Sequence, residues 1–271
     1  MAVFLLFLLA TAAGSISTLF WIPEDDLGRG YFQMNALIVL GLLGLALSVV
    51  VLKPPEGFGA TTDTARLSLI VALVGAFLYY GAIWRESWRW ARAAAALALI
   101  GSGAALVIGG SELIHRITPL PHRELLLAVA LVLSALILGW SLITMLLGHW
   151  YLIAPRLTFR HLVVFCWVLL AIVLLRVGAV GSSLLAASSI DAMANPHPIR
   201  LLTGFAAQGM FFWFRIFWGL AIPLLLALMS LHCARQRSNQ SATGILYVLV
   251  VGAFIGEITA LFLTLTVGVP V

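Results

Sequence analysis

Long apolar stretches, separated by short polar connections, follow one another along the whole chain. A helix of about 20 such residues crosses the hydrocarbon core of a bilayer, which is roughly 30 Å thick. Inside that core the backbone must satisfy its own hydrogen bonds, and in stretches rich in leucine, alanine and valine this requires helices. The pattern predicts an all-α polytopic membrane protein with short loops, built as one bundle over residues 1–271. About eight transmembrane helices are expected, at residues 2–22, 31–53, 66–84, 92–112, 124–150, 161–187, 204–232 and 243–267.

The composition supports a membrane protein and excludes several other classes. Hydrophobic residues make up 63% of the chain and charged residues only 9%, with a mean hydropathy of +1.13. A soluble domain, by comparison, carries about 25% charged residues. The longest connection, at residues 188–203, is too short for a soluble domain, and the sequence contains no nucleotide-binding loop or zinc motif. Chemistry on nucleotides or nucleic acids by this chain alone is therefore not expected.

The basic residues lie mainly at the ends of the predicted spans and indicate an orientation. The connections after spans 1, 3, 5 and 7 hold eight arginines, against five arginines and lysines on the other side. Under the positive-inside rule, this difference places those connections in the cytoplasm and both termini outside. We therefore expect an integral protein of the bacterial inner membrane with periplasmic termini. The net charge of +5 fits contact with lipid headgroups better than a nucleic-acid partner.

Polar residues at membrane depth are concentrated in the second half of the chain. Residues 1–116 contain mainly packing helices, whose glycines allow neighbouring backbones to approach closely. Residues 117–271 contain the helices that carry buried polar side chains. Within the seventh span, Pro223 removes a backbone hydrogen bond, so the sequence predicts a distortion of that helix.

Three ionisable residues, Arg176, Arg215 and Glu257, lie inside the last three predicted spans. A charge at the centre of a bilayer costs at least about 3 kcal/mol, so such residues usually face the interior of a bundle and often mark a functional site. From the helical rise, the three lie roughly 22, 25 and 21 Å from the cytoplasmic ends of their helices. We therefore expect two cations and one anion to meet at one level in the outward half of the membrane.

Two interpretations of this trio remain open. In the first, Glu257 bridges both guanidinium groups and ties three helices together, because buried charges require partners. In the second, one carboxylate cannot neutralise two arginines, and the remaining positive charge of Arg176 and Arg215 binds an anion or a quinone carbonyl group. Glu257 would then be the catalytic residue that supplies or removes protons.

Three histidines form a second candidate group at the predicted cytoplasmic ends of their spans. His149 ends the fifth span, His161 begins the sixth and His232 ends the seventh. Neutral imidazoles are common ligands of haem iron, and two of them on neighbouring helices would make a haem b site. Their terminal positions favour the alternative, in which they are interfacial side chains bonded to water, headgroups or carbonyl groups. The sequence indicates no other metal site.

The last span contains the sequence GEITALFL (residues 256–263), a Gly-Glu pair at the start of an apolar half-helix. Together with the helix count and the short loops, this sequence resembles the eight-helix membrane anchors of the polysulfide-reductase and DMSO-reductase type. Such anchors exchange electrons between a membrane quinone and an iron–sulfur partner. The resemblance carries over to Glu257 alone. The chain lacks the cysteine cluster of an iron–sulfur centre, so a redox partner would be a separate chain.

These observations lead to one functional hypothesis and two alternatives. We expect an integral membrane subunit of a respiratory electron-transfer complex, which interacts with quinone and takes part in proton transfer. Such a chain is at most a subunit of an oxidoreductase, and spans 5–8 would form its quinone pocket. The alternatives are a small transporter of an anionic solute, which would use the same arginines, and a haem b cytochrome. The expected partners are the lipid bilayer and other subunits of a membrane complex.

Overall fold

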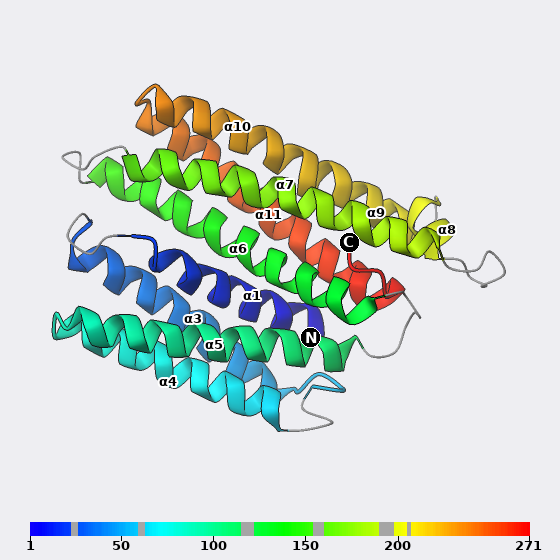
Figure 1. The fold of residues 1–271 in the computed structure, drawn as a ribbon, viewed down its shortest axis with the longest axis horizontal. Coiled ribbons are helices and arrows are strands. Elements are labelled where there is room, and N and C mark those ends of the chain that lie inside the picture. Colours follow the sequence, from blue (N-terminus) through cyan, green and yellow to red (C-terminus); the bar gives the residue numbers. More distant parts are fainter. Residues whose placement is uncertain (23–26, 59–62, 115–121, 154–159, 190–197, 205–206) are drawn as a thin grey trace.

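The computed structural model describes residues 1–22, 27–58, 63–114, 122–153, 160–189, 198–204 and 207–271 (Figure 1). In this part of the chain the regular structure is helical, without strands, and eight segments are long and apolar enough to cross a membrane. Seven of these segments are single helices: α1 (Ala2–Leu19), α3 (Arg29–Leu52), α4 (Thr64–Trp84), α5 (Trp88–Leu113), α6 (Arg123–Ile153), α7 (Arg160–Ser188) and α11 (Asn239–Val267). The eighth, Ala207–Arg235, consists of α9 (Ala207–Ile216), the π-helix η1 (Phe217–Ala221) and α10 (Ile222–Arg235).

The predicted fold class is confirmed, since the chain is an all-α polytopic membrane protein by the length and composition of its helices. Each predicted span falls on one crossing segment, and the ends agree within four residues. The sequence pattern did not reveal α8 (Pro198–Thr203), a short helix in the connection between α7 and α9. Six residues are too few for a recognisable hydrophobic period, which explains the omission.

The first helix, α1, lies in the middle of the bundle, where it packs against α6 as well as α3 and α5 (Figure 1). Most of its residues are buried. At the crossing of α1 and α6 the two backbones touch, because a Cβ atom at Gly139 would lie 1.9 Å from the carbonyl carbon of Gly14. Close backbone contact through small residues is a main source of helix association in lipid. Accordingly, α1 is a core element rather than a lipid-facing one.

Helices α4 and α5 form a tightly packed pair at the edge of the bundle (Figure 1). A Cβ atom at Gly75 would lie 2.5 Å from the backbone nitrogen of Ala98, and one at Gly101 would lie 2.6 Å from that of Ala72. The outward face of the pair carries exposed apolar side chains such as Phe77. The α4–α5 pair therefore presents apolar side chains on the outside of the bundle.

The seventh crossing segment is irregular at the place that the sequence predicts. Pro223 lies at the beginning of α10, directly after the π-helical turn η1. Proline cannot donate a backbone hydrogen bond, and the wider turn before it accommodates this loss. Single π-helical turns within α-helices occur frequently at functional sites. This turn follows Arg215 by two residues.

After α11 the chain reverses direction. Gly268 ends the helix in the left-handed conformation, with φ of 79°, which glycine adopts without steric cost. The following residues return into the bundle (Figure 1), and Val269 and Val271 are fully buried there. Residues Gly268–Val271, the C-terminal segment, pack against α7, α9 and α11 in an apolar cluster of their own. The C-terminal segment therefore lies beside the helices that carry the charged trio.

Candidate functional site

Arg176, Arg215 and Glu257 meet inside the bundle, and this predicted geometry is confirmed. Nη2 and Nε of Arg176, on α7, lie 2.9 and 3.2 Å from the two carboxylate oxygens of Glu257 on α11. Nη2 of Arg215, near the end of α9, lies 2.6 Å from Oε1 of the same carboxylate. The side chains are 2%, 0% and 0% exposed, respectively. The trio therefore forms one buried ion-paired cluster that joins three membrane-crossing segments.

A fourth side chain, Ser134 on α6, completes the surroundings of the carboxylate. Its Oγ donates to Oε2 of Glu257 at 2.6 Å and accepts from Nη2 of Arg176 at 3.1 Å. The carboxylate of Glu257 thus accepts four hydrogen bonds, an arrangement typical of its ionised form. Sequence reasoning missed Ser134, which lies in the apolar run LVLSALILGW.

Arg215 is held by the irregular turn of the seventh crossing. Its Nη1 donates to the carbonyl oxygen of Gly219, in η1, at 2.9 Å. Gly219 packs directly against Gly256, the residue before Glu257 in the chain. A Cβ atom at Gly256 would lie 2.4 Å from the Cα of Gly219 and 3.0 Å from Nη1 of Arg215. Glycine at this position therefore lets α11 approach closely enough for Glu257 to pair with Arg215.

The cluster has more hydrogen-bond donors than acceptors. Nη1 of Arg176 and Nε of Arg215 are buried and have no hydrogen-bond partner among the described residues. Nη2 of Arg176 also reaches the main-chain oxygen of Val271, in the C-terminal segment, at 3.3 Å. This distance is longer than the usual N–H···O separation of about 2.9 Å. These unpaired N–H groups can donate hydrogen bonds to one further oxygen atom, in particular an oxygen that carries or gains negative charge.

The charge of the cluster is also unbalanced. Two guanidinium groups and one carboxylate give the side chains of Arg176, Arg215 and Glu257 a net charge of +1. The ties between helices that the structural interpretation requires are present, and the three side chains carry one more positive charge than negative. Ligand binding by the arginines and proton transfer by Glu257 stay predictions.

The three histidines lie at helix ends, on the opposite side of the crossing segments from the C-terminal segment. Nδ1 of His149, on α6, lies 3.0 Å from the hydroxyl of Tyr247 on α11. Nε2 of His232, on α10, lies 2.9 Å from the side-chain nitrogen of Gln236. His161 lies in the first turn of α7. No group of three or more metal-ligating residues is found in the part of the chain described. Haem ligation by these histidines stays a prediction.

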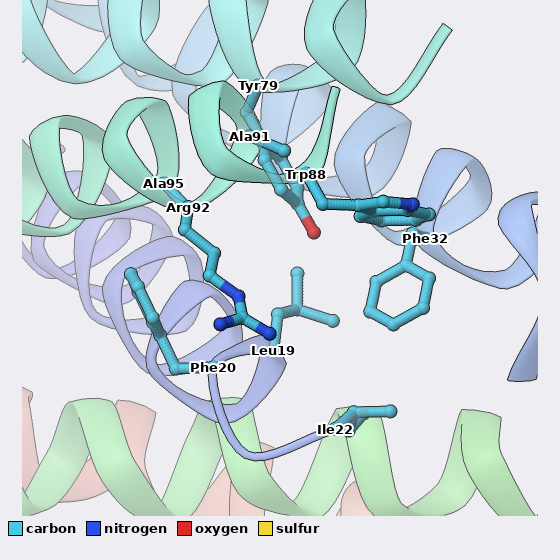
Figure 2. Close-up of a pocket in the computed structure, with 9 residues that line it drawn as sticks. All are labelled: Leu19, Phe20, Ile22, Phe32, Tyr79, Trp88, Ala91, Arg92 and Ala95. Atoms are coloured by element: carbon cyan, nitrogen blue, oxygen red, sulfur yellow. The ribbon is translucent and has the colours of Figure 1, made fainter. Parts of the chain in front are cut away.

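A small pocket lies between the end of α1 and the helices α3, α4 and α5 (Figure 2). Phe32, Tyr79 and Trp88 line it, and the side chain of Arg92 projects toward it. Its volume is about 20 Å³, enough for one water molecule but not for an organic ligand. This pocket is therefore no candidate for a substrate site.

A larger, membrane-facing groove lies between α6 and α7. Its volume is about 890 Å³ and its lining is almost wholly apolar. Among the lining residues are Leu133 and Leu175, which precede Ser134 and Arg176 directly in the chain. We refer to it as the α6–α7 groove. It places space for an apolar chain next to the helices that hold the charge cluster.

Replacement of Ser134 by alanine removes one of the donors to Oε2 of Glu257. We expect the free energy of unfolding to fall by about 1.5–3 kcal/mol, because the lost hydrogen bond is buried and involves a charged group. Denaturant unfolding of the purified protein in detergent, followed by circular dichroism, measures the change.

Ser141→Ala provides the matched control for this variant. Ser141 is buried on the same helix, but among the described residues its hydroxyl bonds only to the carbonyl oxygen of Leu138. Its replacement should cost no more than about 1 kcal/mol. Equal losses in the two variants would show that Ser134 has no special part in holding Glu257.

In comparisons with known protein families, with characterised proteins and with solved structures, the chain gives no match. The fold and the site themselves define a class, namely a polytopic helical membrane protein with a buried, net-positive charge cluster. The resemblance to quinone-interacting membrane anchors stays a prediction.

Proposed function

We propose that the protein is the membrane subunit of an electron-transfer complex and that it binds a quinone at the cluster of Arg176, Arg215 and Glu257. The surplus of buried donors carries this proposal, because Nη1 of Arg176 and Nε of Arg215 have no acceptor in the described part of the chain. A quinone head group offers two carbonyl oxygens, which gain negative charge on reduction. Guanidinium groups held in a site without water stabilise such charge strongly.

The helices that carry Ser134 and Arg176 also line space for the apolar tail of a ligand. The α6–α7 groove, with its volume of about 890 Å³, offers space for an isoprenoid chain. The main-chain oxygen of Val271 accepts from Nη2 of Arg176 at 3.3 Å. In the proposal, the C-terminal segment moves aside and an oxygen of the quinone head group replaces the Val271 oxygen as acceptor.

Each residue of the cluster has its own task in this proposal. A bound quinol supplies two electrons and two protons on oxidation to the quinone, and the electrons pass to an iron–sulfur centre of a partner subunit. Arg176 and Arg215 bind and orient the head-group oxygen. Glu257 accepts the two protons one after the other and passes each on to the aqueous side. Ser134 keeps the carboxylate aligned through its hydrogen bond to Oε2.

The orientation of the protein belongs to the same proposal. We place it in a bacterial inner membrane with both termini periplasmic. Support comes from the eight arginines on the side that follows spans 1, 3, 5 and 7, against five basic residues on the other side. The cluster would then lie in the periplasmic half of the bilayer.

Purification in a mild detergent, followed by organic extraction, tests the proposal. We expect close to one quinone per protein, together with a co-purifying redox subunit. Arg176→Gln should lower the quinone content at least about tenfold, because the head group loses a charge-assisted hydrogen bond. Arg123→Gln is the control, since Arg123 begins α6 and bonds to the carbonyl oxygen of Ile114, away from the cluster. A wild-type preparation with neither quinone nor a redox subunit would refute the proposal.

Transport of an anionic solute is a second candidate function, favoured by the interruption of the seventh crossing segment. The π-helix η1 separates α9 from α10 next to Arg215. Transporters commonly bind their substrates where a crossing helix is interrupted. Uptake of labelled succinate into proteoliposomes, abolished in Arg215→Gln, would favour transport over electron transfer.

A further inference from the structure

A second groove is lined by residues of α4 and α5 and reaches the connection between these two helices. Its volume is about 940 Å³. The small residues Gly81 and Ala93 line it, together with Phe77, Trp84 and Trp90, which are 68%, 58% and 73% exposed. A Cβ atom at Gly81 would meet no atom within 4 Å, so the space beside Gly81 is open to a ligand. We refer to this feature as the α4–α5 groove.

The α4–α5 groove extends from membrane depth to the level of the lipid headgroups. Trp84 ends α4 and Trp90 lies in the first turn of α5, and tryptophans at helix ends mark the membrane–water interface. Arg85 lines the groove at this end, while Phe77 and Leu97 line it further into the membrane. The groove therefore suits a ligand with a polar group at the interface and an apolar chain within the bilayer.

Arginines predominate in the sequence at the interfacial end of the groove. Arg85, Arg89 and Arg92 lie within eight residues, and Glu86 is the only acidic residue in the sequence between positions 64 and 111. Arg92 projects toward the small pocket of Figure 2, which leaves Arg85 as the arginine that lines the groove.

Among the described residues, the carboxylate of Glu86 at this end is already engaged. Oε1 of Glu86 lies 3.2 Å from Nη1 of Arg29, whose guanidinium group lies 4.7 Å from the ring centre of Trp84. The side chain of Arg85 is exposed and has no hydrogen bond or ion pair with any other described residue. Its charge is therefore available to an anionic ligand.

We propose that the α4–α5 groove binds an anionic phospholipid of the bilayer, with the phosphate at Arg85 and an acyl chain along Gly81 and Ala93. Basic pockets between transmembrane helices are known to take anionic headgroups, and each basic residue at the surface strengthens binding about fivefold. The apolar lining distinguishes this ligand from free phosphate, which has no chain to occupy the groove. The site is independent of the charge cluster of Arg176, Arg215 and Glu257.

Native mass spectrometry tests this site on the full protein, released from nanodiscs that contain equal amounts of phosphatidylglycerol and phosphatidylcholine. We expect wild-type protein to retain phosphatidylglycerol in preference to phosphatidylcholine. Arg85→Gln should lower this preference about fivefold. Gly81→Leu should lower the retention of both lipids, since the leucine side chain would fill space within the groove. Circular dichroism checks that both variants keep their helical content.

Arg66→Gln is the matched control, because Arg66 lies at the other end of α4 and pairs with Asp63 at 3.4 Å. This variant should keep the wild-type preference. Equal retention of the two lipids by the wild type, or an unchanged preference in Arg85→Gln, would overturn the proposal. So would displacement of the lipid by inorganic phosphate alone. Retention of neither lipid would point to a helix of a partner subunit in the groove and would also overturn the proposal.

Discussion

Glu257→Gln is expected to destabilise the folded protein by about 3–5 kcal/mol. The substitution leaves the guanidinium groups of Arg176 and Arg215, 2% and 0% exposed, without the carboxylate that faces both of them. An uncompensated buried charge costs far more than a lost surface ion pair, because no water is present to solvate it. Denaturant unfolding in detergent, compared with the wild type, measures the change.

The control for this result removes all three charges together. A variant that combines Arg176→Met, Arg215→Met and Glu257→Met contains no unpaired charge in the cluster. Replacement of a buried ionic group by apolar residues of similar volume is often neutral or stabilising. We therefore expect the free energy of unfolding to stay within about 2 kcal/mol of the wild-type value. A Glu257→Gln variant as stable as the wild type would be incompatible with the ion pairs described above.

Gly256→Ala is expected to lower the free energy of unfolding by about 1–3 kcal/mol. The new Cβ atom would lie 2.4 Å from the Cα of Gly219 and 3.0 Å from Nη1 of Arg215, so α11 has to move away from η1. This movement also lengthens the contact of 2.6 Å between Arg215 and Glu257. Unfolding in detergent measures the stability, and the quinone content of the purified protein reports the effect on the site.

Gly252→Ala is the matched control, one turn earlier on the same helix. The nearest atom to a Cβ at Gly252 is 3.6 Å away, on Pro223, which is an ordinary van der Waals contact. Alanine also favours the helical conformation over glycine by about 1 kcal/mol. Gly252→Ala should therefore be as stable as the wild type or slightly more stable. Equal free energies of unfolding for Gly256→Ala and Gly252→Ala would show that the close approach of α11 to η1 does not require glycine at position 256.

The helices could be predicted because the bilayer imposes a simple rule on the sequence. A span needs about 20 apolar residues, and each of the eight crossing segments meets this requirement with clear polar boundaries. The interruption before Pro223 was also expected, because proline lacks a backbone donor. The sequence did not reveal that the interruption would be a π-helical turn, since this depends on how α11 packs against it.

The charged members of the site could be predicted for a similar reason. Charges at membrane depth are rare, so Arg176, Arg215 and Glu257 stand out in their apolar spans. Ser134 did not stand out, because serines in transmembrane helices usually bond to their own backbone, as Ser141 does. The contact of Arg176 with Val271 had no signal in the sequence, since it involves a main-chain oxygen.

The first half of the chain also contains buried polar side chains, although its composition indicates mainly apolar packing helices. Tyr31 and Asn35, one turn apart on α3, are both fully buried. The hydroxyl of Tyr31 and Oδ1 of Asn35 have no hydrogen-bond partner among the described residues. Isolated polar residues in an apolar helix look alike in a sequence whether they face lipid, water or a buried interior, so their burial became visible only in the structure.

A double-mutant cycle on Arg215 and Glu257 most directly tests whether these two side chains interact in the folded protein. The free energies of unfolding of Arg215→Met, Glu257→Met and the double variant are compared with that of the wild type in the same detergent. We expect the double variant to lose at least about 1 kcal/mol less than the sum of the single losses, because residues in one buried ion-pair network are strongly coupled. Losses that add within about 0.5 kcal/mol would mean that the two side chains do not interact, and would contradict the cluster on which the proposed function rests.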